Sequence, residues 1–240
     1  LVDISLTTSP IKSAKGRVIG ASKIMRDITE LAKARDRQQL LLREMNHRVK
    51  NLFALSGSIV GLSARSAGSA QELADSTRER LAALARAHSL TFTHNVVDAS
   101  EQPATLQSLI KTIVAPFDGP GVNGTSRISI SGVNLPVASS AVASLALLLH
   151  EFATNAAKYG SLSTAEGAID IACSLDGDQL ALIWAERGGP PVAEPRTPEG
   201  FGAVLSRIAV NMQLGGEIRR WWKPEGLTIH LVVPQARLTG

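Results

Sequence analysis

One histidine stands among charged and polar side chains in the segment of residues 44–51, Glu-Met-Asn-His-Arg-Val-Lys-Asn. If this segment is helical, Glu44, three residues before His47, and Asn51, four residues after it, share one face with the histidine. Arg48 lies one step round the helix. Histidine has an ordinary pKa of about 6.5, and nearby cations keep the imidazole neutral and therefore nucleophilic. The segment predicts an imidazole that can accept a phosphoryl group, although a solvated helix face with a chance histidine has the same pattern.

A second polar group lies further along the chain, within a run that is otherwise apolar. At helical spacing Glu151, Asn155 and Lys158 occupy positions i, i+4 and i+7 and form one stripe. A carboxylate, a carboxamide and an ammonium group in a row suit a cation held between protein oxygens and a polyphosphate, because Mg²⁺ takes oxygen ligands and keeps water and phosphate partners. The alternative is an ordinary solvent-facing stripe.

A third group flanks a loop rich in glycine and proline at residues 187–200. Alternation along a strand places Trp184 and Glu186 on the same face just before this loop, where the carboxylate can accept a hydrogen bond from the exocyclic amine of a base. Gly200 and Gly202 open the next helix, and such helix starts receive phosphate. Two glycines alone are a weak signal. A loop of this length inside a compact domain is typical of a lid or a binding loop.

The beginning of the chain predicts two strands, at residues 4–11 and 17–25, joined by a turn. A lone hairpin is not stable in water, so we expect these strands to belong to a larger sheet. The chain starts at Leu1 without a methionine, and we therefore expect it to be a piece of a longer protein.

A helix is expected to follow from Asp27, because apolar residues recur every three or four positions and mark a narrow seam. His47 is two residues from both Met45 and Val49 of that seam, which turns it about 160 to 200 degrees away from the seam at about 100 degrees per residue. The sequence thus predicts a helix that packs or dimerises through its seam and displays the histidine outward.

Gly57, Gly61 and the Ser-Ala-Gly-Ser run at 66–69 are expected to end this helix, and a second helix is expected at residues 71–88. The two helices form a hairpin, and two hairpins form a four-helix bundle in a dimer. His88 lies on the apolar stripe of the second helix, where a core histidine is a more frequent finding than a ligand. Residues 94–104 are expected to be a polar linker.

The remainder of the chain predicts a second domain, an α+β sandwich with helices on one face of a sheet, because its strands are grouped after its helices and do not alternate regularly with them. In the long helix, Leu145, Leu148, Phe152, Ala156 and Tyr159 are expected to form the core stripe. The expected helices are 105–115, 138–159 and 202–213, and the expected strands are 127–131, 168–175, 179–185, 216–222 and 227–233.

Composition limits the function classes. The chain has 240 residues, 44% of them hydrophobic, a formal net charge of +4 and one cysteine. Cys173 cannot form an internal disulfide or a cysteine-based metal site, and its place in an alternating apolar run suggests a buried thiol in a reducing compartment. The modest positive charge favours an acidic or phosphorylated partner and does not argue for nucleic acid. The sequence contains no apolar run long enough to span a bilayer.

Several of these segments also match a family pattern, in the family's order, from about residue 40 to residue 233. The segments are His47-Arg48-Val49-Lys50-Asn51, Arg86-Ala87-His88, His150-Glu151, Thr154-Asn155-Ala156-Ala157-Lys158-Tyr159-Gly160, Trp184-Ala185-Glu186, Arg187-Gly188-Gly189-Pro190-Pro191-Val192 and Gly200-Phe201-Gly202. Together they resemble the sensor histidine kinases of the HWE class, which is named for a histidine on the nucleotide-binding helix and for Trp-x-Glu. Residues 1–29 resemble, more weakly, the last strands and exit motif of a PAS sensor domain.

The resemblance implies three parts: the end of a PAS-like domain at 1–29, a linker helix and phosphoacceptor hairpin at 30–94, and an ATP-binding domain of the histidine-kinase type at 104–236. It implies Asn155 as the Mg²⁺ ligand and Glu186 as the residue that binds adenine. The cofactor-binding set is then Glu151, Asn155, Lys158, Tyr159, Trp184, Glu186, Gly188, Gly189, Gly200 and Gly202. His150 and Trp184 match family signatures without a role that the sequence explains.

The implied activity is autophosphorylation of His47 by ATP and Mg²⁺, followed by transfer to an aspartate on a response regulator receiver domain. The residue after the acceptor histidine is often acidic in the wider superfamily, whereas here it is Arg48. Glu44 is therefore the first candidate for the assisting base and Glu151 the second, with Asn51 also in the acceptor site. We further expect a homodimer, an upstream PAS- or LOV-like sensor domain and a bacterial cytoplasmic location. The rival functions are a non-catalytic phosphotransfer module that binds nucleotide without turnover and a domain-moving ATPase of the same fold.

Overall fold

The computed structural model of the chain describes residues 2–92, 104–121, 124–191 and 201–240. The chain divides into two units, Leu1–Ser58 and Ile59–Gly240, and each is considered by itself. None of the helices in the described ranges is both long enough and apolar enough to cross a membrane.

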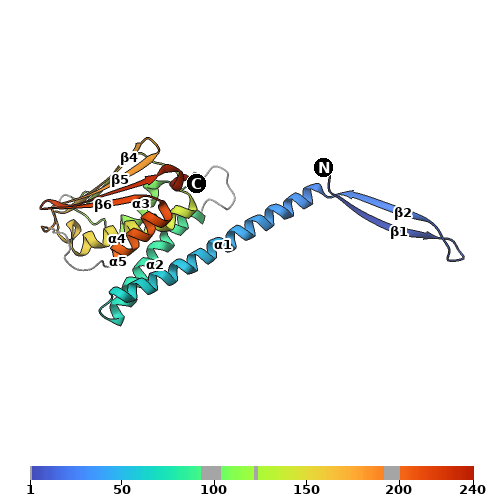
Figure 1. Ribbon diagram of the computed structural model, residues 1–240, viewed down its shortest axis with the longest axis horizontal. Helices are drawn as coiled ribbons and strands as arrows, with labels where there is room; N and C mark the ends of the chain where they lie inside the picture. The colour runs from blue at the N-terminus through green and yellow to red at the C-terminus, as the bar shows by residue number, and fades with distance from the viewer. Residues whose placement is uncertain (1, 93–103, 122–123, 192–200) are drawn as a thin grey trace. The chain divides into compact units, whose positions relative to one another are not determined.

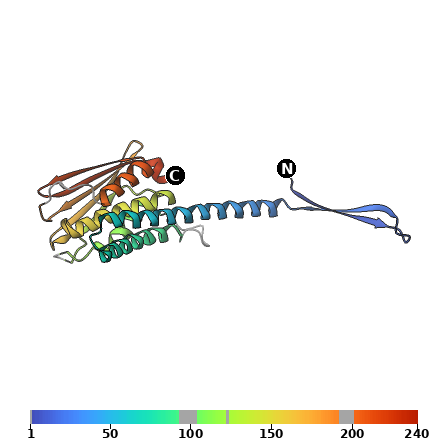
Figure 2. The ribbon, with the colours of Figure 1, turned by 60° about the horizontal axis from the view of Figure 1, so that its bottom comes forward.

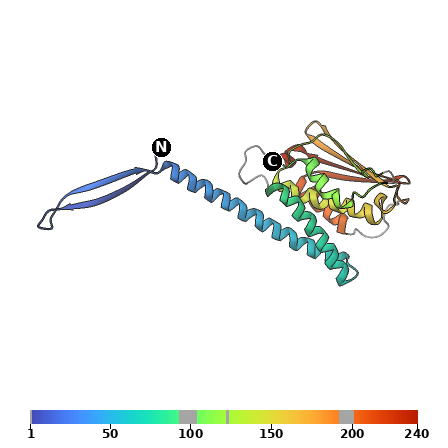
Figure 3. The ribbon, with the colours of Figure 1, turned by 180° about the vertical axis from the view of Figure 1, so that it is seen from behind.

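The first unit begins with two antiparallel strands, β1 (Ile4–Lys12) and β2 (Val18–Asp27), which form the two-stranded ribbon seen in Figure 3. Leu6 lies opposite Met25 on one face, and every residue of both strands is exposed. The two expected strands are confirmed. Two exposed strands have no hydrophobic core of their own. That they belong to a larger sheet stays a prediction.

Helix α1 (Thr29–Ser66) follows directly, and Asp27 Oδ1 accepts a hydrogen bond from the Thr29 N–H at 2.9 Å at its start. Helix α1 ends at Ser66, as expected from the run at 66–69, whereas the expectation that Gly57 and Gly61 help to end it is wrong, because α1 passes through both. A glycine inside a helix costs about 1 kcal/mol relative to alanine, which tertiary packing can offset. Ile59, between the two glycines, is only 1% exposed and supplies such packing.

Helix α2 (Ala70–Phe92) starts with a cap in which Ser69 Oγ accepts a hydrogen bond from the Glu72 N–H at 3.1 Å, while Glu72 Oε2 accepts one from the Gly68 N–H at 2.8 Å. Its buried face is centred on Ala83 and Ala87, which belong to the same hydrophobic core as the sheet. Helix α2 therefore packs against α3 and α4 of the second unit. The sequence analysis predicted that α2 forms a hairpin with α1 and did not predict its contacts with α3 and α4.

The second unit is built on a five-stranded sheet of order β3-β4-β5-β7-β6, in which β3 pairs in parallel with β4 and the other pairs are antiparallel. The strands are β3 (Ile128–Gly132), β4 (Ala168–Asp176), β5 (Gln179–Arg187), β6 (Glu217–Lys223) and β7 (Gly226–Pro234). Helices α3 (Leu106–Val114), α4 (Ser139–Lys158) and α5 (Phe201–Arg207) lie on one face of this sheet (Figures 1 and 2). The expected α+β sandwich is confirmed.

Alternation along the central strands explains this arrangement. In β4 as far as Cys173, and throughout β5, every second residue is buried, including Ile169, Ile171, Leu182 and Trp184. Successive side chains of a strand point to opposite faces, so one face of the sheet meets the helices. Cys173, on the same buried face of β4, is 3% exposed, and burial raises the pKa of its thiol to about 11.

The segment expected to be one α-helix at 202–213 differs from that prediction. After α5 the chain continues as a π-helix, η3 (Ile208–Leu214), and leaves it through Gly215, which has a φ of 63°. Within η3 the Gln213 side chain accepts a hydrogen bond from Ser144 Oγ of α4. The π-helical segment thus coincides with a polar contact to α4. π-Helical turns are frequent at functional sites. The short helices η1 (Ala115–Phe117), η2 (Ser161–Ser163) and α6 (Gln235–Thr239) complete the unit.

Candidate active site

Helix α4 brings part of the expected cofactor site together with the start of α5. A Cβ atom built on Gly202 would lie 3.6 Å from Glu151 Oε2 and 3.7 Å from Asn155 Nδ2. Asn155 and Lys158 are exposed, as expected for a face turned away from the core. Gly200 lies outside the described residues. Gly202, the second residue of α5, therefore lies next to the Glu151 carboxylate and the Asn155 carboxamide, and it has no side chain to fill the space beside them.

The oxygen donors at this place suit Mg²⁺. Glu151 and Asn155 offer carboxylate and carboxamide oxygens one helical turn apart. In the described ranges, no group of three or more His, Cys, Asp and Glu side chains could form a complete metal cage. Mg²⁺ is bound in proteins by one or two carboxylate or amide ligands together with waters and substrate phosphates, so a sparse donor set fits this ion better than it fits Zn²⁺ or Ca²⁺.

Glu151 does not face solvent, which counts against the alternative of an ordinary solvent-facing stripe at this position. Its side chain is 7% exposed and forms an ion pair with Arg80 of α2, whose Nε donates to Oε1 at 2.8 Å and whose Nη2 donates to Oε2 at 3.3 Å. Sequence reasoning missed Arg80, because nothing in the spacing of α2 separates it from the other arginines of that helix. The pair satisfies a carboxylate that burial would otherwise penalise.

The second expected feature, the shared face of Trp184 and Glu186, is confirmed, and both side chains are buried. Glu186 is 5% exposed, and its two oxygens accept hydrogen bonds from the Ser161 N–H at 2.8 Å and from Trp184 Nε1 at 3.3 Å. Burial raises the pKa of this carboxyl, and the hydrogen bonds from Ser161 and Trp184 act in the opposite direction. Trp184 is fully buried and meets Phe152 edge to face at 5.7 Å.

Glycines give this carboxylate its space. A Cβ atom on Gly160 would lie 2.1 Å from Glu186 Oε2, and one on Gly189 would lie 2.7 Å from Ser161 Cα. Gly188 has a φ of 69°, a conformation that favours glycine. The hydroxyl of Ser161 is also buried beside Glu186. Sequence reasoning missed Ser161, and a hydroxyl next to a carboxylate offers both a donor and an acceptor to a base.

The core stripe expected for α4 holds except at its last member. Leu145, Leu148, Phe152 and Ala156 are buried, whereas Tyr159 is 71% exposed. The reason is that α4 ends at Lys158, and Tyr159 has a φ of −132°, so its side chain no longer follows the helical period. Tyr159 therefore lies on the surface at the end of the nucleotide-type helix, beside the Gly160 turn.

His150 is buried in the second unit, where it is 4% exposed and its ring centroid is 5.6 Å from that of Phe117. Burial lowers its pKa from 6.5 to about 4, and the positive charges of Arg86, Arg80 and Lys158 add to this effect. The imidazole is therefore neutral near neutral pH. Its Nδ1 atom has no hydrogen-bond partner within the described part of the chain.

The acceptor segment lies in α1, in the first unit. The helix is continuous from Thr29 to Ser66, which confirms the helical spacing of Glu44, His47, Arg48 and Asn51. Asn51 is exposed. The side chains of the other three lie outside the part of the structure that is described, so their mutual contacts stay a prediction.

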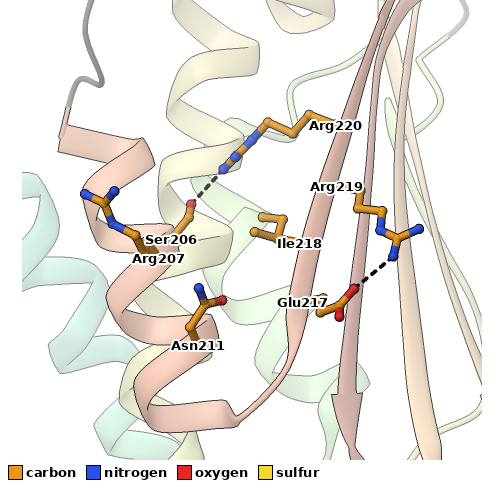
Figure 4. Close-up of a pocket in the computed structure, with 7 residues that line it drawn as sticks. All are labelled: Ser206, Arg207, Asn211, Glu217, Ile218, Arg219 and Arg220. Carbon is orange, nitrogen blue, oxygen red and sulfur yellow. Dashed lines mark hydrogen bonds and ion pairs between the residues drawn. The ribbon is translucent and has the colours of Figure 1, made fainter.

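A separate hollow of about 350 Å³ lies between α5, η3 and the edge strand β6 (Figure 4). Two arginines beside it are engaged, Arg220 with Ser206 Oγ at 2.7 Å and Arg219 with Glu217 at 3.0 Å. None of the residues expected to bind a cofactor lines this hollow. It is therefore distinct from the meeting point of α4 with the start of α5.

Comparison with known proteins places these features in a family. Residues 44–134 match the family model described as HWE histidine kinase. The chain is 32% identical over 214 residues to blue-light-activated histidine kinase 1 of Erythrobacter litoralis (strain HTCC2594), covering 87% of this chain and 57% of that protein. It is 33% identical over 215 residues to the blue-light-activated histidine kinase of Brucella ovis, covering 88% of this chain and 42% of that protein. The chain thus spans about half the length of these relatives.

The fold is also that of a solved histidine kinase. The structure of the Erythrobacter litoralis EL346 blue-light activated histidine kinase superposes with a TM-score of 0.58 at 22% identity and covers 97% of this chain and 70% of that one. A structure of the histidine kinase domain of the same protein gives a TM-score of 0.53 at 18% identity, with 78% of this chain and 98% of that chain covered. The family model assigns an HWE histidine kinase domain at residues 44–134, and the two relatives and the shared fold agree with this assignment.

Proposed function

We propose that this chain is the core of an ATP-dependent protein-histidine kinase that phosphorylates its own His47. The observation that carries the proposal is the meeting of Glu151, Asn155 and Gly202 at the junction of α4 and α5. This junction combines oxygen donors for a cation with a glycine, Gly202, which has no side chain to obstruct a phosphate.

The pocket at Glu186 supports a purine as the base of the nucleotide. Glu186 and the buried Ser161 hydroxyl lie next to each other, and a carboxylate accepts hydrogen bonds from an exocyclic amine. Gly160 and Gly189 keep side chains out of this space. Adenine carries such an amine at the position where guanine carries a carbonyl, so the pocket favours ATP over GTP.

For the transfer itself, we infer that Glu151 and Asn155 hold the cation, and that bound Mg²⁺ neutralises charge on the phosphates. An imidazole nitrogen of His47 forms a bond to the γ-phosphorus, the bond from that phosphorus to the bridging oxygen of ADP breaks, and the imidazole proton passes to a carboxylate. Glu44 is the first candidate for that carboxylate, because it shares a helix face with His47. Catalysis is then mainly positioning and charge stabilisation.

The wider assembly follows from the family pattern and from exposed surfaces. The seam of α1 is uncovered in the single chain, with Leu31 70%, Met45 55% and Val49 45% exposed, and we infer that a second copy covers it. We also infer a PAS-type sensor domain that includes β1 and β2, a response regulator aspartate as the final acceptor, and a cytoplasmic location where ATP is available.

Incubation of the chain with γ-labelled ATP and Mg²⁺ tests the proposed activity. We expect protein-bound label that is lost in acid and retained in alkali, as for a phosphohistidine. His47→Ala should abolish the label, and so should Asn155→Ala, whereas His88→Ala on α2 should retain it if it folds normally. Nucleotide binding without any label in the wild-type chain would instead support a non-catalytic phosphotransfer module.

A further inference from the structure

Arg80 joins three elements of the second unit through its guanidinium group. Besides the two hydrogen bonds to Glu151, its Nη1 donates to Ser63 Oγ of α1 at 2.8 Å. The Arg80 side chain is 11% exposed and Ser63 is fully buried. A buried, two-pronged arginine–carboxylate pair is geometrically specific and strong, so it fixes where the Glu151 carboxylate points.

The same carboxylate faces the proposed phosphate end of the nucleotide site. Glu151 Oε2, which accepts from Arg80 Nη2, is also the oxygen that lies 3.6 Å from the Cβ position of Gly202. Each oxygen of this carboxylate accepts one hydrogen bond from the guanidinium, and the positive charge of Arg80 would repel a cation bound to the same group, so such a cation competes with Arg80 for Glu151.

The contact between α2 and α4 has the polar character of a surface that can separate. Arg86 of α2 lies close enough to His150 of α4 for its charge to act on the imidazole, and Arg86 Nε and His150 Nδ1 are both buried without hydrogen-bond partners among the described residues. Buried polar atoms without partners are rare in permanent cores. Separation of α2 from α4 would return these groups to water, which offsets part of the apolar contact that is lost.

We propose that Arg80 is a positioning residue whose ion pair with Glu151 opposes cation binding by that carboxylate. Binding of nucleotide with Mg²⁺ and the ion pair that joins α2 to α4 are then mutually exclusive uses of Glu151. This inference rests on the proposed function, because it requires a cation site at Glu151. Competition is reciprocal: whatever strengthens the ion pair weakens Mg²⁺-dependent nucleotide binding, and bound nucleotide with Mg²⁺ loosens α2 from α4 by the same factor.

The first test measures the affinity of the full chain for a non-hydrolysable ATP analogue by calorimetry, with Mg²⁺ and with a chelator. Arg80→Met keeps the length of the side chain and removes the ion pair. We expect the ratio of the two affinities to rise about tenfold, within the usual range of coupling between sites. Arg80→Lys, which keeps the charge but cannot occupy both oxygens, should give a smaller rise, and it serves as the test variant if Arg80→Met does not fold.

Arg78→Met is the matched control. Arg78 lies two residues away on the same helix, its side chain is 73% exposed, and it pairs with Asp75 and not with the site. This variant loses the same charge, so an effect of net charge alone would appear in it as well. We expect its ratio to equal that of the wild-type chain.

The second test measures a distance within the second unit. Spin labels at Glu79→Cys on α2 and Lys111→Cys on α3 occupy exposed positions, while the native Cys173 is buried and does not compete for the label. The wild-type distance should lengthen or broaden when the analogue and Mg²⁺ are added together, and not with the analogue alone. Arg80→Met should show the longer distances already without ligand.

An unchanged or lowered affinity ratio in Arg80→Met and Arg80→Lys would overturn the inference, as would a distance that does not respond to the analogue with Mg²⁺. Failure of the proposed function is a separate outcome, because it appears as a wild-type chain that binds no analogue under either condition.

Discussion

Acidification should destabilise the fold through His150, and the size of the effect follows from its burial. The folded-state pKa is about 4, against 6.5 for an ordinary histidine. The unfolded chain therefore takes up a proton at a higher pH than the folded chain does. The free energy of unfolding should fall as the pH drops from about 6.5 to about 4 and should change no further through this group below that range. At about 1.4 kcal/mol per pKa unit, the full effect is about 3 kcal/mol.

The assay is urea unfolding at a series of pH values, for the wild-type chain and for His150→Phe. Phenylalanine keeps an aromatic ring next to Phe117 and cannot be protonated. Tryptophan fluorescence reports the second unit, because Trp184, Trp221 and Trp222 all belong to its sheet. Other groups, including Glu186, titrate in both proteins and cancel in the difference. That difference should grow by about 3 kcal/mol in favour of the variant between pH 7 and pH 4. Parallel profiles would refute the idea that His150 is held neutral by burial.

Further predictions concern the nucleotide pocket and the signalling helix. Gly160→Ala should lower stability by about 1 to 3 kcal/mol in thermal unfolding, because its Cβ atom would meet Glu186 Oε2 at 2.1 Å. Gly202→Ala should leave stability unchanged, since its nearest contacts are at 3.6 and 3.7 Å, but it should weaken binding of the ATP analogue. Equal effects of the two changes on stability would contradict this geometry. Asn155→Ala should remove Mg²⁺-dependent binding with the fold intact, and Glu186→Gln should reduce the preference for ATP over GTP by about 1 to 3 kcal/mol, both measured by calorimetry. In the full-length protein, inserting one residue near Arg37 rotates the downstream helix by about 100 degrees and should alter signal control, whereas seven residues restore the phase to within about 20 degrees and should preserve it. Kinase activity that responds equally to signal at every insertion length would exclude the helix as the transmitter.

Local patterns predicted most elements of the second unit correctly. Strands β4 and β5 and helix α4 each bury one face in the core. The spacing of apolar residues in the sequence shows which face that is. For the same reason, the shared face of Trp184 and Glu186 was visible before the structure. The ends of helices and the type of helix were harder to predict from the sequence. Helix α1 continues through Gly57 because tertiary packing overrides helix propensity. The π-helix η3 has no sequence pattern that distinguishes it from an α-helix.

Contacts between distant segments were not predictable from periodicity. The pairing of Arg80 with Glu151 joins residues 71 positions apart, and no spacing rule on either helix selects one arginine of α2 over another. The bond between Ser161 and Glu186 likewise depends on how the turn after α4 meets the end of β5. Motif spacing selected the residues that we propose to bind the nucleotide, whereas the pairing of Glu151 with Arg80 emerged only from the packing of α2 on α4.

Location of the phosphoryl group on the chain tests the central claim most directly. After reaction with ATP and Mg²⁺, tryptic digestion at alkaline pH cleaves after Arg43 and Arg48, so the peptide of residues 44–48 contains His47 as its one histidine. Mass spectrometry with fragmentation that preserves the phosphorus–nitrogen bond should find this peptide heavier by one phosphoryl group, and no other histidine peptide modified. A phosphoryl group on the peptide that carries His88 or His150, with residues 44–48 unmodified, would contradict the assignment of His47 as the acceptor.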